Sequence, residues 1–251
     1  MDSTTARRLI AEIAPRVAGA RVADVVAPGA DCLLLELATR PRLFLGAVTM
    51  KALPMLFLLD GPAHGPGHAA APPFVSQLRG SVLVSLKPLD DRPGAVAHLQ
   101  WTSQVGRSIE RWLTIDLGRN PSLALSDVLR AHDPSLPEGG ASAPTVARWH
   151  DERGRLHARL SSENRNEPAE ETRGFDTLNA AACFMFTELW PELDLARRRE
   201  AVEKVIERRL KRTHRAMDKV QVEIDDSQNA ARYRHMAQLL LTHQAEIARG
   251  A

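Results

Sequence analysis

The residues best suited to chemistry in this chain are basic, and most of them gather toward its C-terminal end. Residues 197–219 contain ten lysines and arginines against four aspartates and glutamates. Such a stretch can bind the phosphates of a nucleic acid, although a solvated charged surface is the commoner meaning of such a run. The formal net charge of the whole chain is only +2, so the positive charge is unevenly distributed. The residues we nominate for phosphate contact in this stretch are Arg208, Arg209, Lys211 and Arg212.

Patterns typical of catalysis or metal binding are weak. His64 and His68 have a metal-compatible spacing, but they lie in a loop rich in glycine and proline with no cysteine nearby, so we expect a solvated loop. Cys32 and Cys183 are set among apolar neighbours and are expected to be buried thiols rather than a disulfide. The chain has no glycine-rich phosphate loop and no recognisable Ser-His-Asp order. We therefore expect a binding protein and not an enzyme, with no cofactor and no metal ion.

The basic stretch belongs to a long predicted helix. Two series of residues follow coiled-coil spacing, with a slip in register between them: Ile206, Leu210, Thr213, Met217, Val220 and Ile224, then Ala230, Tyr233, Ala237, Leu240, Gln244 and Ile247. An unbroken helix over residues 192–249 would be on the order of 85 Å long. A solitary helix of that length needs a partner, and we expect the chain to self-associate through the first series.

The first half of the chain contains an internal repeat. Residues 19–28 and 80–88 each read as a glycine, a largely apolar strand and a proline, and Asp31 and Asp91 follow three residues after those prolines. Both copies continue as strand, turn and strand, and close on Asp60 and Asp127 respectively. A repeat of about 60 residues with four short strands indicates two stacked antiparallel sheets. The predicted fold class is α+β, a duplicated sandwich-like domain followed by a long coiled-coil helix.

Composition suggests three regions. We expect a β-rich domain at residues 1–131, an irregular connector at 132–175 with one weak hairpin near 145–160, and a helical region at 176–251 that forms the first arm of a coiled coil. The apolar run at residues 52–59 is interrupted by Pro54 and is far shorter than the roughly 20 residues that span a bilayer. The N-terminal pattern is that of an amphipathic helix and not of a signal peptide, so we expect a cytoplasmic protein without membrane contact.

Several motifs in this order resemble the bacterial NFACT family, which includes the RqcH-like proteins and the proteins once called fibronectin-binding protein A. The likeness rests on Gly19-Ala-Arg-Val, on Pro88-Leu-Asp-Asp91-Arg92, on Leu113-Thr-Ile-Asp-Leu-Gly118-Arg119 leading to Asp127, and on Ala230-Ala-Arg-Tyr-Arg-His-Met-Ala-Gln with a close at Ile247-Ala-Arg-Gly250. It covers residues 9–127 and roughly 201–250, and leaves the connector unmatched.

The resemblance implies a fold and a function. It implies an N-terminal domain shaped like that of formamidopyrimidine-DNA glycosylase, although the start Met1-Asp2-Ser3 lacks the N-terminal proline that glycosylase chemistry requires. It implies a factor in ribosome-associated quality control that binds tRNA and the large ribosomal subunit, where the ribosome itself adds an alanine tail to a stalled nascent chain. It also implies that a returning helix and a C-terminal domain lie outside this chain, which would then be a fragment or a shortened relative. The alternative is a coiled-coil scaffold or a fibronectin-binding-like interaction module.

The resemblance also assigns site residues. Asp91 and Arg92 match the family's Asp-Arg pair, which is implicated in tRNA contact, and Arg119 belongs to the second matching motif. Arginine can stack on a base or clasp a phosphate, and the aspartate can hold it in place. The alternative for the pair is a turn aspartate beside a surface arginine. Two departures weaken the match, since residues 120–122 read Asn-Pro-Ser where the family has His-Ser-Asn, and the Arg-Lys-His run usual before residues 74–80 is missing.

Overall fold

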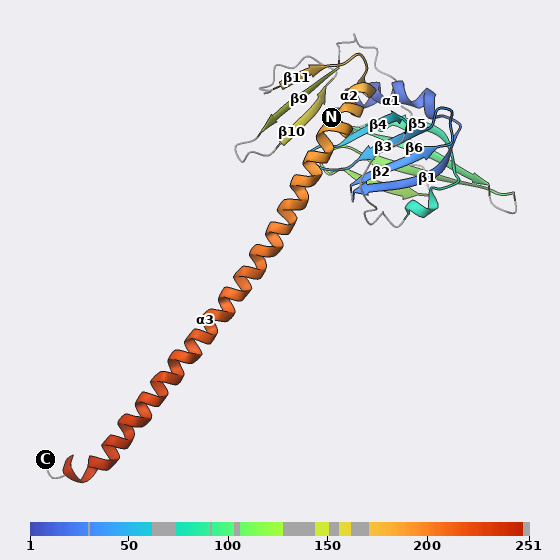
Figure 1. Ribbon diagram of the computed structural model, residues 1–251. Coiled ribbons are helices and arrows are strands. Elements are labelled where there is room, and N and C mark those ends of the chain that lie inside the picture. The colour runs from blue at the N-terminus through green and yellow to red at the C-terminus, as the bar shows by residue number, and fades with distance from the viewer. Residues whose placement is uncertain are drawn as a thin grey trace. The chain divides into compact units, whose positions relative to one another are not determined.

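The structure of the protein, a computed structural model, describes residues 1–29, 31–61, 74–90, 92–102, 106–127, 144–150, 156–161 and 171–247. The chain divides into two compact units, Met1–Asp194 and Leu195–Ala251. The first unit is α+β with a large antiparallel sheet, and the second unit contains most of a long helix (Figure 1). The elements up to residue 126 are α1 (Ser3–Val17), β1 (Ala20–Gly29), β2 (Cys32–Leu37), β3 (Leu43–Val48), β4 (Met55–Asp60), a 3-10 turn (Val75–Gln77), β5 (Val82–Pro88), β6 (Gly94–Thr102), β7 (Ser108–Asp116) and β8 (Ser122–Ser126). They are followed by β9 (Thr145–His150), β10 (Leu156–Ser161), β11 (Glu171–Gly174), α2 (Leu178–Phe184), a π-helix (Met185–Leu189) and α3 (Trp190–Ile247).

Eight strands form one antiparallel sheet in the order β4-β3-β2-β1-β5-β6-β7-β8. Each copy of the repeat supplies four consecutive strands, and the two copies are hydrogen-bonded to each other where β1 pairs with β5. The prediction of two separate sheets was therefore wrong. The reason is the length of β1, because Ala20 and Arg21 at its start pair with β5 while the rest of the strand pairs with β2.

Gly19 and Gly80 open the two copies in the same conformation. Their φ angles are +77° and +82°, in the left-handed region that glycine adopts without steric cost. The N–H of Gly19 donates to the carbonyl of Leu83 at 2.8 Å, and the N–H of Gly80 donates to the carbonyl of Val22 at 2.8 Å. Each acceptor stands three residues after the other copy's glycine. The sequence repeat thus becomes an approximate two-fold arrangement about the junction of β1 and β5.

Helix α1 packs an apolar side against strands of both copies. The carboxylate of Asp2 caps the helix, since it accepts the backbone N–H of Thr5 at 2.7 Å. The helix contacts β4, β5 and β6. Its buried side chains recur at helical spacing: Ala6, Leu9, Ile10, Ile13 and Val17. One continuous hydrophobic core therefore joins α1 to both halves of the sheet.

The segment from α2 to the start of α3 covers the first copy of the repeat. All six residues of β3 are buried, and because alternate side chains point to opposite faces, both faces of that strand are covered. The ring of Phe186 in the π-helix stacks on Phe57 of β4 with centroids 4.3 Å apart. The side chain of Asn179 both accepts from the N–H of Leu58 and donates to its carbonyl, at 2.7 Å and 2.9 Å. Strand β8 alternates between exposed and half-buried residues instead.

The region predicted to be an irregular connector contains a second sheet. Strands β9, β10 and β11 form three antiparallel strands in the order β10-β9-β11. The hairpin expected near residues 145–160 is the pairing of β9 with β10. The irregular assignment was wrong for β11, which was missed because its four residues, Glu-Thr-Arg-Gly, show no apolar alternation.

Helix α3 is continuous over 58 residues, which corresponds to about 87 Å. The described side chains from Ala201 to Gln244 are all exposed, including the apolar ones of the predicted coiled-coil series. Ile206, Leu210 and Met217, for example, are 52%, 52% and 63% exposed. The long helix was thus predicted correctly, and its apolar series lies open along the described part of the chain. None of the helices in the described ranges is both long enough and apolar enough to cross a membrane.

Candidate nucleic-acid interface

The turn between β5 and β6 is packed against the end of β7. The N–H of Leu89 donates to the carbonyl of Gly94 at 3.0 Å, and the N–H of Leu117 donates to the carbonyl of Pro93 at 2.9 Å. Gly94 has a φ of +154°, and a Cβ atom there would lie 2.2 Å from the carbonyl oxygen of Ile115. Only glycine fits this close approach, so the turn holds Arg92 at a defined place beside β7.

Arg92 is anchored by an aspartate at the end of β7. Its Nη1 lies 2.7 Å from Oδ2 of Asp116, and the arginine side chain is 58% exposed while the aspartate side chain is 12% exposed. The other carboxylate oxygen of Asp116 accepts the N–H of Gly118 at 2.8 Å. A nearly buried carboxylate therefore holds the guanidinium at the surface, where its remaining N–H groups can reach a phosphate or a base.

Two more arginines belong to this part of the first unit. Arg119 follows Gly118 directly, is exposed, and has no ion pair among the described residues. Arg7 of α1 is half-buried and donates from Nη2 to the backbone carbonyl of Asp90. Asp91, the other member of the predicted pair, lies outside the described residues. We name Arg92, Asp116 and Arg119 the arginine turn.

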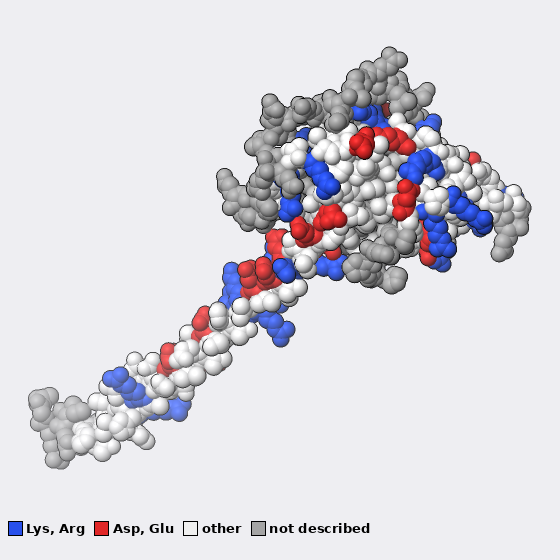
Figure 2. Space-filling model, turned by 45° about the horizontal axis from the view of Figure 1, so that its top comes forward, with Lys and Arg blue, Asp and Glu red and all other residues white. Residues whose placement is uncertain are grey.

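The second candidate surface is one side of α3. At about 100° per residue, the directions of Lys204, Arg208, Lys211, Arg215 and Lys219 fall within one face of the helix, which we name the basic stripe. The first apolar series, from Ile206 to Ile224, faces the opposite way, about 180° around the helix. Figure 2 shows basic side chains along α3, and the residues of the stripe are all exposed. A helix that packs on the apolar series would leave the basic stripe open to solvent.

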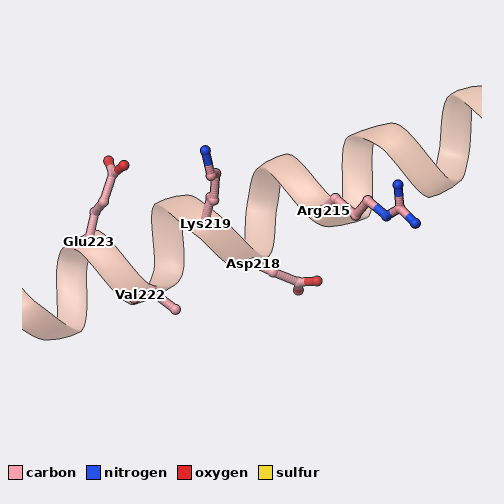
Figure 3. Close-up of a pocket in the computed structure, with 5 residues that line it drawn as sticks. All are labelled: Arg215, Asp218, Lys219, Val222 and Glu223. Carbon is pink, nitrogen blue, oxygen red and sulfur yellow. The ribbon is translucent and has the colours of Figure 1, made fainter.

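Side chains near the end of the basic stripe line a shallow depression, shown in Figure 3. Lys219 and Glu223 extend to one side of the helix, and Asp218 and Val222 extend to the other. The two carboxylates break the run of positive charge here. The continuous part of the basic stripe therefore lies on the N-terminal side of Asp218.

The structure sorts the residues nominated from the sequence into two groups. Arg92 and Arg119 come together around the end of β7, in the first unit. Arg208 and Lys211 lie in the basic stripe of the second unit, Arg212 lies at its edge, and Arg209 is turned toward the apolar series. Charge count alone does not distinguish the faces of a helix, so the sequence nominated Arg209 together with the residues of the basic stripe.

Sequence reasoning missed Asp116, the residue that orients Arg92. It stands within the motif Leu113-Thr-Ile-Asp-Leu-Gly118, so its position was visible, but its partner was not. Lys204, Arg215 and Lys219 were also missed, although steps of three and four residues connect them with Arg208 and Lys211. His64 and His68 lie outside the described residues.

Cys32 is buried and Cys183 is half-buried, and the pKa of each thiol is raised. Burial raises the pKa of Cys32 to about 12, with a further contribution from the negative charge of Asp194. Burial likewise raises the pKa of Cys183 to about 11, and its Sγ donates to the carbonyl of Leu58 at 3.3 Å. Both are free cysteines, as predicted. A thiol with so high a pKa is almost entirely protonated at neutral pH and is a poor nucleophile.

Comparison with known proteins gives a relationship of fold. No family model matches the chain, and no curated protein matches its sequence. Its structure is similar to that of the fibrinogen binding protein from Staphylococcus aureus, with a TM-score of 0.51, 12% sequence identity, and coverage of 74% of this chain and 98% of that chain. This similarity shows that the two proteins share a fold.

Two further solved structures match over part of their length. One is the N-terminal part of the fibronectin/fibrinogen-binding protein from Streptococcus suis, with a TM-score of 0.46 and 16% identity over 51% of this chain and 49% of that chain. The other is the N-terminal domain of the fibronectin-binding protein PavA from Streptococcus pneumoniae, with a TM-score of 0.44 and 15% identity over 49% of this chain and 48% of that chain. The chain thus spans about half the length of each.

Proposed function

We propose that this protein is an RNA-binding factor of the NFACT type, which contacts tRNA and the large ribosomal subunit in ribosome-associated quality control. The observation that carries the proposal is the anchored guanidinium of Arg92. An arginine held by a nearly buried carboxylate is oriented before its ligand arrives, so less conformational entropy is lost on binding. Asp91 and Arg92 also match the Asp-Arg pair of the NFACT motif.

The basic stripe supports the same proposal from the second unit. Its five cations recur every three or four residues, and Arg208, Lys211, Arg215 and Lys219 have no ion pair among the described residues. Unpaired exposed cations are the groups that replace counterions around a nucleic acid. In this proposal the arginine turn contacts tRNA, the basic stripe contacts ribosomal RNA, and the ribosome performs any alanine tailing. The two-fold arrangement of the sheet supports the finer proposal that the domain has the shape of the glycosylase N-terminal domain.

The test is direct binding to both RNAs. Fluorescence anisotropy with labelled tRNA over a salt series, and co-sedimentation with purified large ribosomal subunits, should both show binding that weakens as salt rises. A matched pair of triple variants separates the surfaces of α3: Arg208, Lys211 and Arg215 to Gln should reduce co-sedimentation, whereas Glu200, Glu203 and Glu207 to Gln should not. Absence of binding to tRNA and to the subunit at low salt would refute the proposal.

The alternative function is binding of a matrix or plasma protein. It is favoured by one observation, the shared fold with a protein described as fibrinogen binding. The same preparation should be tested on immobilised fibrinogen and fibronectin. Saturable binding to either protein, without binding to tRNA or to ribosomal subunits, would decide for the alternative.

A further inference from the structure

A small cavity in the first unit lies apart from the arginine turn. It has a volume of about 150 Å³ and lies where β9 and β11 of the small sheet meet α2, the π-helix and the first turn of α3. Its lining residues are Val146, Arg148, Arg173, Phe184, Glu188, Leu189 and Glu192. At ~30 Å³ for each water molecule, this volume corresponds to about five waters. The cavity therefore suits a small molecule of fewer than about ten non-hydrogen atoms.

The backbone brings two arginines to one face of the small sheet. Arg173 of β11 is paired in register with Val146 of β9, and Arg148 follows two residues later on the same side of that strand. Val146 is only 2% exposed, so this face is the one that packs on the helical segment. Nη2 of Arg148 lies 3.4 Å from a carboxylate oxygen of Glu192, so Arg148 already has an acidic partner. The other cation that lines the cavity is Arg173.

The guanidinium of Arg173 is held by aromatic rings and not by an acid. It lies 4.5 Å from the ring centroid of Phe184 and 5.4 Å from that of Phe175. Stacking on the rings uses the flat face of the guanidinium, while its N–H donors point outward in the plane of the group. Among the described residues no carboxylate pairs with Arg173. Its planar fork is thus positioned and unoccupied, which is the geometry that receives a carboxylate through two hydrogen bonds.

Glu188 supplies an unpaired negative charge on the same cavity. It belongs to the π-helix, in which the N–H of Trp190 donates to the carbonyl of Met185. Within the described chain, Glu188 has no ion pair with Arg173 or with any other cation, although both side chains line one cavity. The π-turn also places Leu189 beside Glu188 in the lining, and π-turns occur frequently at functional sites.

We propose that this cavity binds a small aliphatic α-amino acid. The carboxylate of the ligand would pair with Arg173, its ammonium group would pair with Glu188, and its side chain would contact Val146, Leu189 and the ring of Phe184. A zwitterion can pair with both Arg173 and Glu188, which line one cavity but form no ion pair with each other. An aliphatic side chain matches the three apolar lining residues, and L-valine is of the size that the volume admits. The proposal does not depend on RNA binding.

The test uses L-valine, N-acetyl-L-valine and L-valinamide on the full chain, with isothermal titration calorimetry and saturation-transfer NMR. L-valine should bind with a dissociation constant of about 1 mM or tighter. N-acetyl-L-valine, which lacks the ammonium group, and L-valinamide, which lacks the carboxylate, should each bind about tenfold more weakly. No detectable binding of L-valine at ~10 mM, or equal binding of the three compounds, would overturn the proposal.

Single substitutions test which residue binds the ammonium group of the ligand and which binds its carboxylate. Glu188→Gln should remove the preference for L-valine over N-acetyl-L-valine, whereas Glu203→Gln, a matched change at an exposed glutamate of α3 outside the cavity, should leave it unchanged. Arg173→Lys keeps the charge without the planar fork and should weaken L-valine binding several-fold. If Arg173→Lys weakens binding but Glu188→Gln has no effect, the cavity is a simple carboxylate site and the assignment of a zwitterion is wrong.

Discussion

Arg92→Ala should lower stability slightly, and Arg119→Ala should not. Arg92 pairs with Asp116 at 2.7 Å, but more than half of the arginine side chain is exposed. Screening by solvent therefore limits the contribution of the pair to about 0.5–1 kcal/mol. Truncation leaves the Asp116 carboxylate with the N–H of Gly118 as its partner. For a unit of this size the expected fall in Tm is about 1–4 °C, whereas Arg119→Ala should change the unfolding free energy by less than about 0.5 kcal/mol.

The same two variants should weaken tRNA binding to a similar extent. If each arginine contacts one phosphate, each substitution lowers the slope of log K against log salt concentration by about 0.7–0.9. Differential scanning fluorimetry measures the change in Tm, and anisotropy with labelled tRNA over a salt series measures the change in tRNA affinity and in its salt dependence. An unchanged affinity in both variants would remove the arginine turn from the binding surface. A fall in Tm above ~8 °C for Arg92→Ala would instead make that arginine a structural residue.

Three further predictions concern packing and protonation. Replacing Leu210 and Met217 of the exposed apolar series by Glu should abolish self-association of the chain, as measured by light scattering; a wild type that is monomeric at tens of micromolar would contradict it. Gly46→Ala should destabilise the first unit by about 2–3 kcal/mol in urea unfolding, because the new Cβ would lie 2.1 Å from the buried ring of Phe57; an unchanged midpoint would contradict this packing. The pKa of Cys32 is raised from 9.0 to about 12, so as the pH rises this thiol ionises in the unfolded chain before it ionises in the folded chain. The free energy of unfolding should therefore fall above about pH 9 by ~1.4 kcal/mol per pH unit. Cys32→Ala should reduce this slope.

Much of the fold could be predicted from the sequence because the patterns that indicate its strands and its long helix are local. The repeat was visible through its glycines and prolines, and the strands predicted in residues 19–60 and 80–127 correspond to β1–β4 and β5–β8. The spacing of Ile206, Leu210 and Met217 likewise predicted the long helix. The small sheet was harder, since β11 is short and polar and acquires its strand conformation only by pairing with β9.

The candidate sites also divide into those with a local sequence signal and those that depend on tertiary contacts. The sequence by itself determined that the basic stripe and the apolar series lie on opposite sides of α3, because helical geometry alone relates residues three, four and seven positions apart, although only Arg208 and Lys211 of the stripe were nominated from it. Only the tertiary structure decided that Asp116 holds Arg92, and that Arg173 and Glu188 line one cavity. These residues come from different elements, and the contact between Arg92 and Asp116 depends on the register of β6 with β7. No local sequence pattern predicts a contact between side chains of different elements, because such a contact results from the packing of the whole unit.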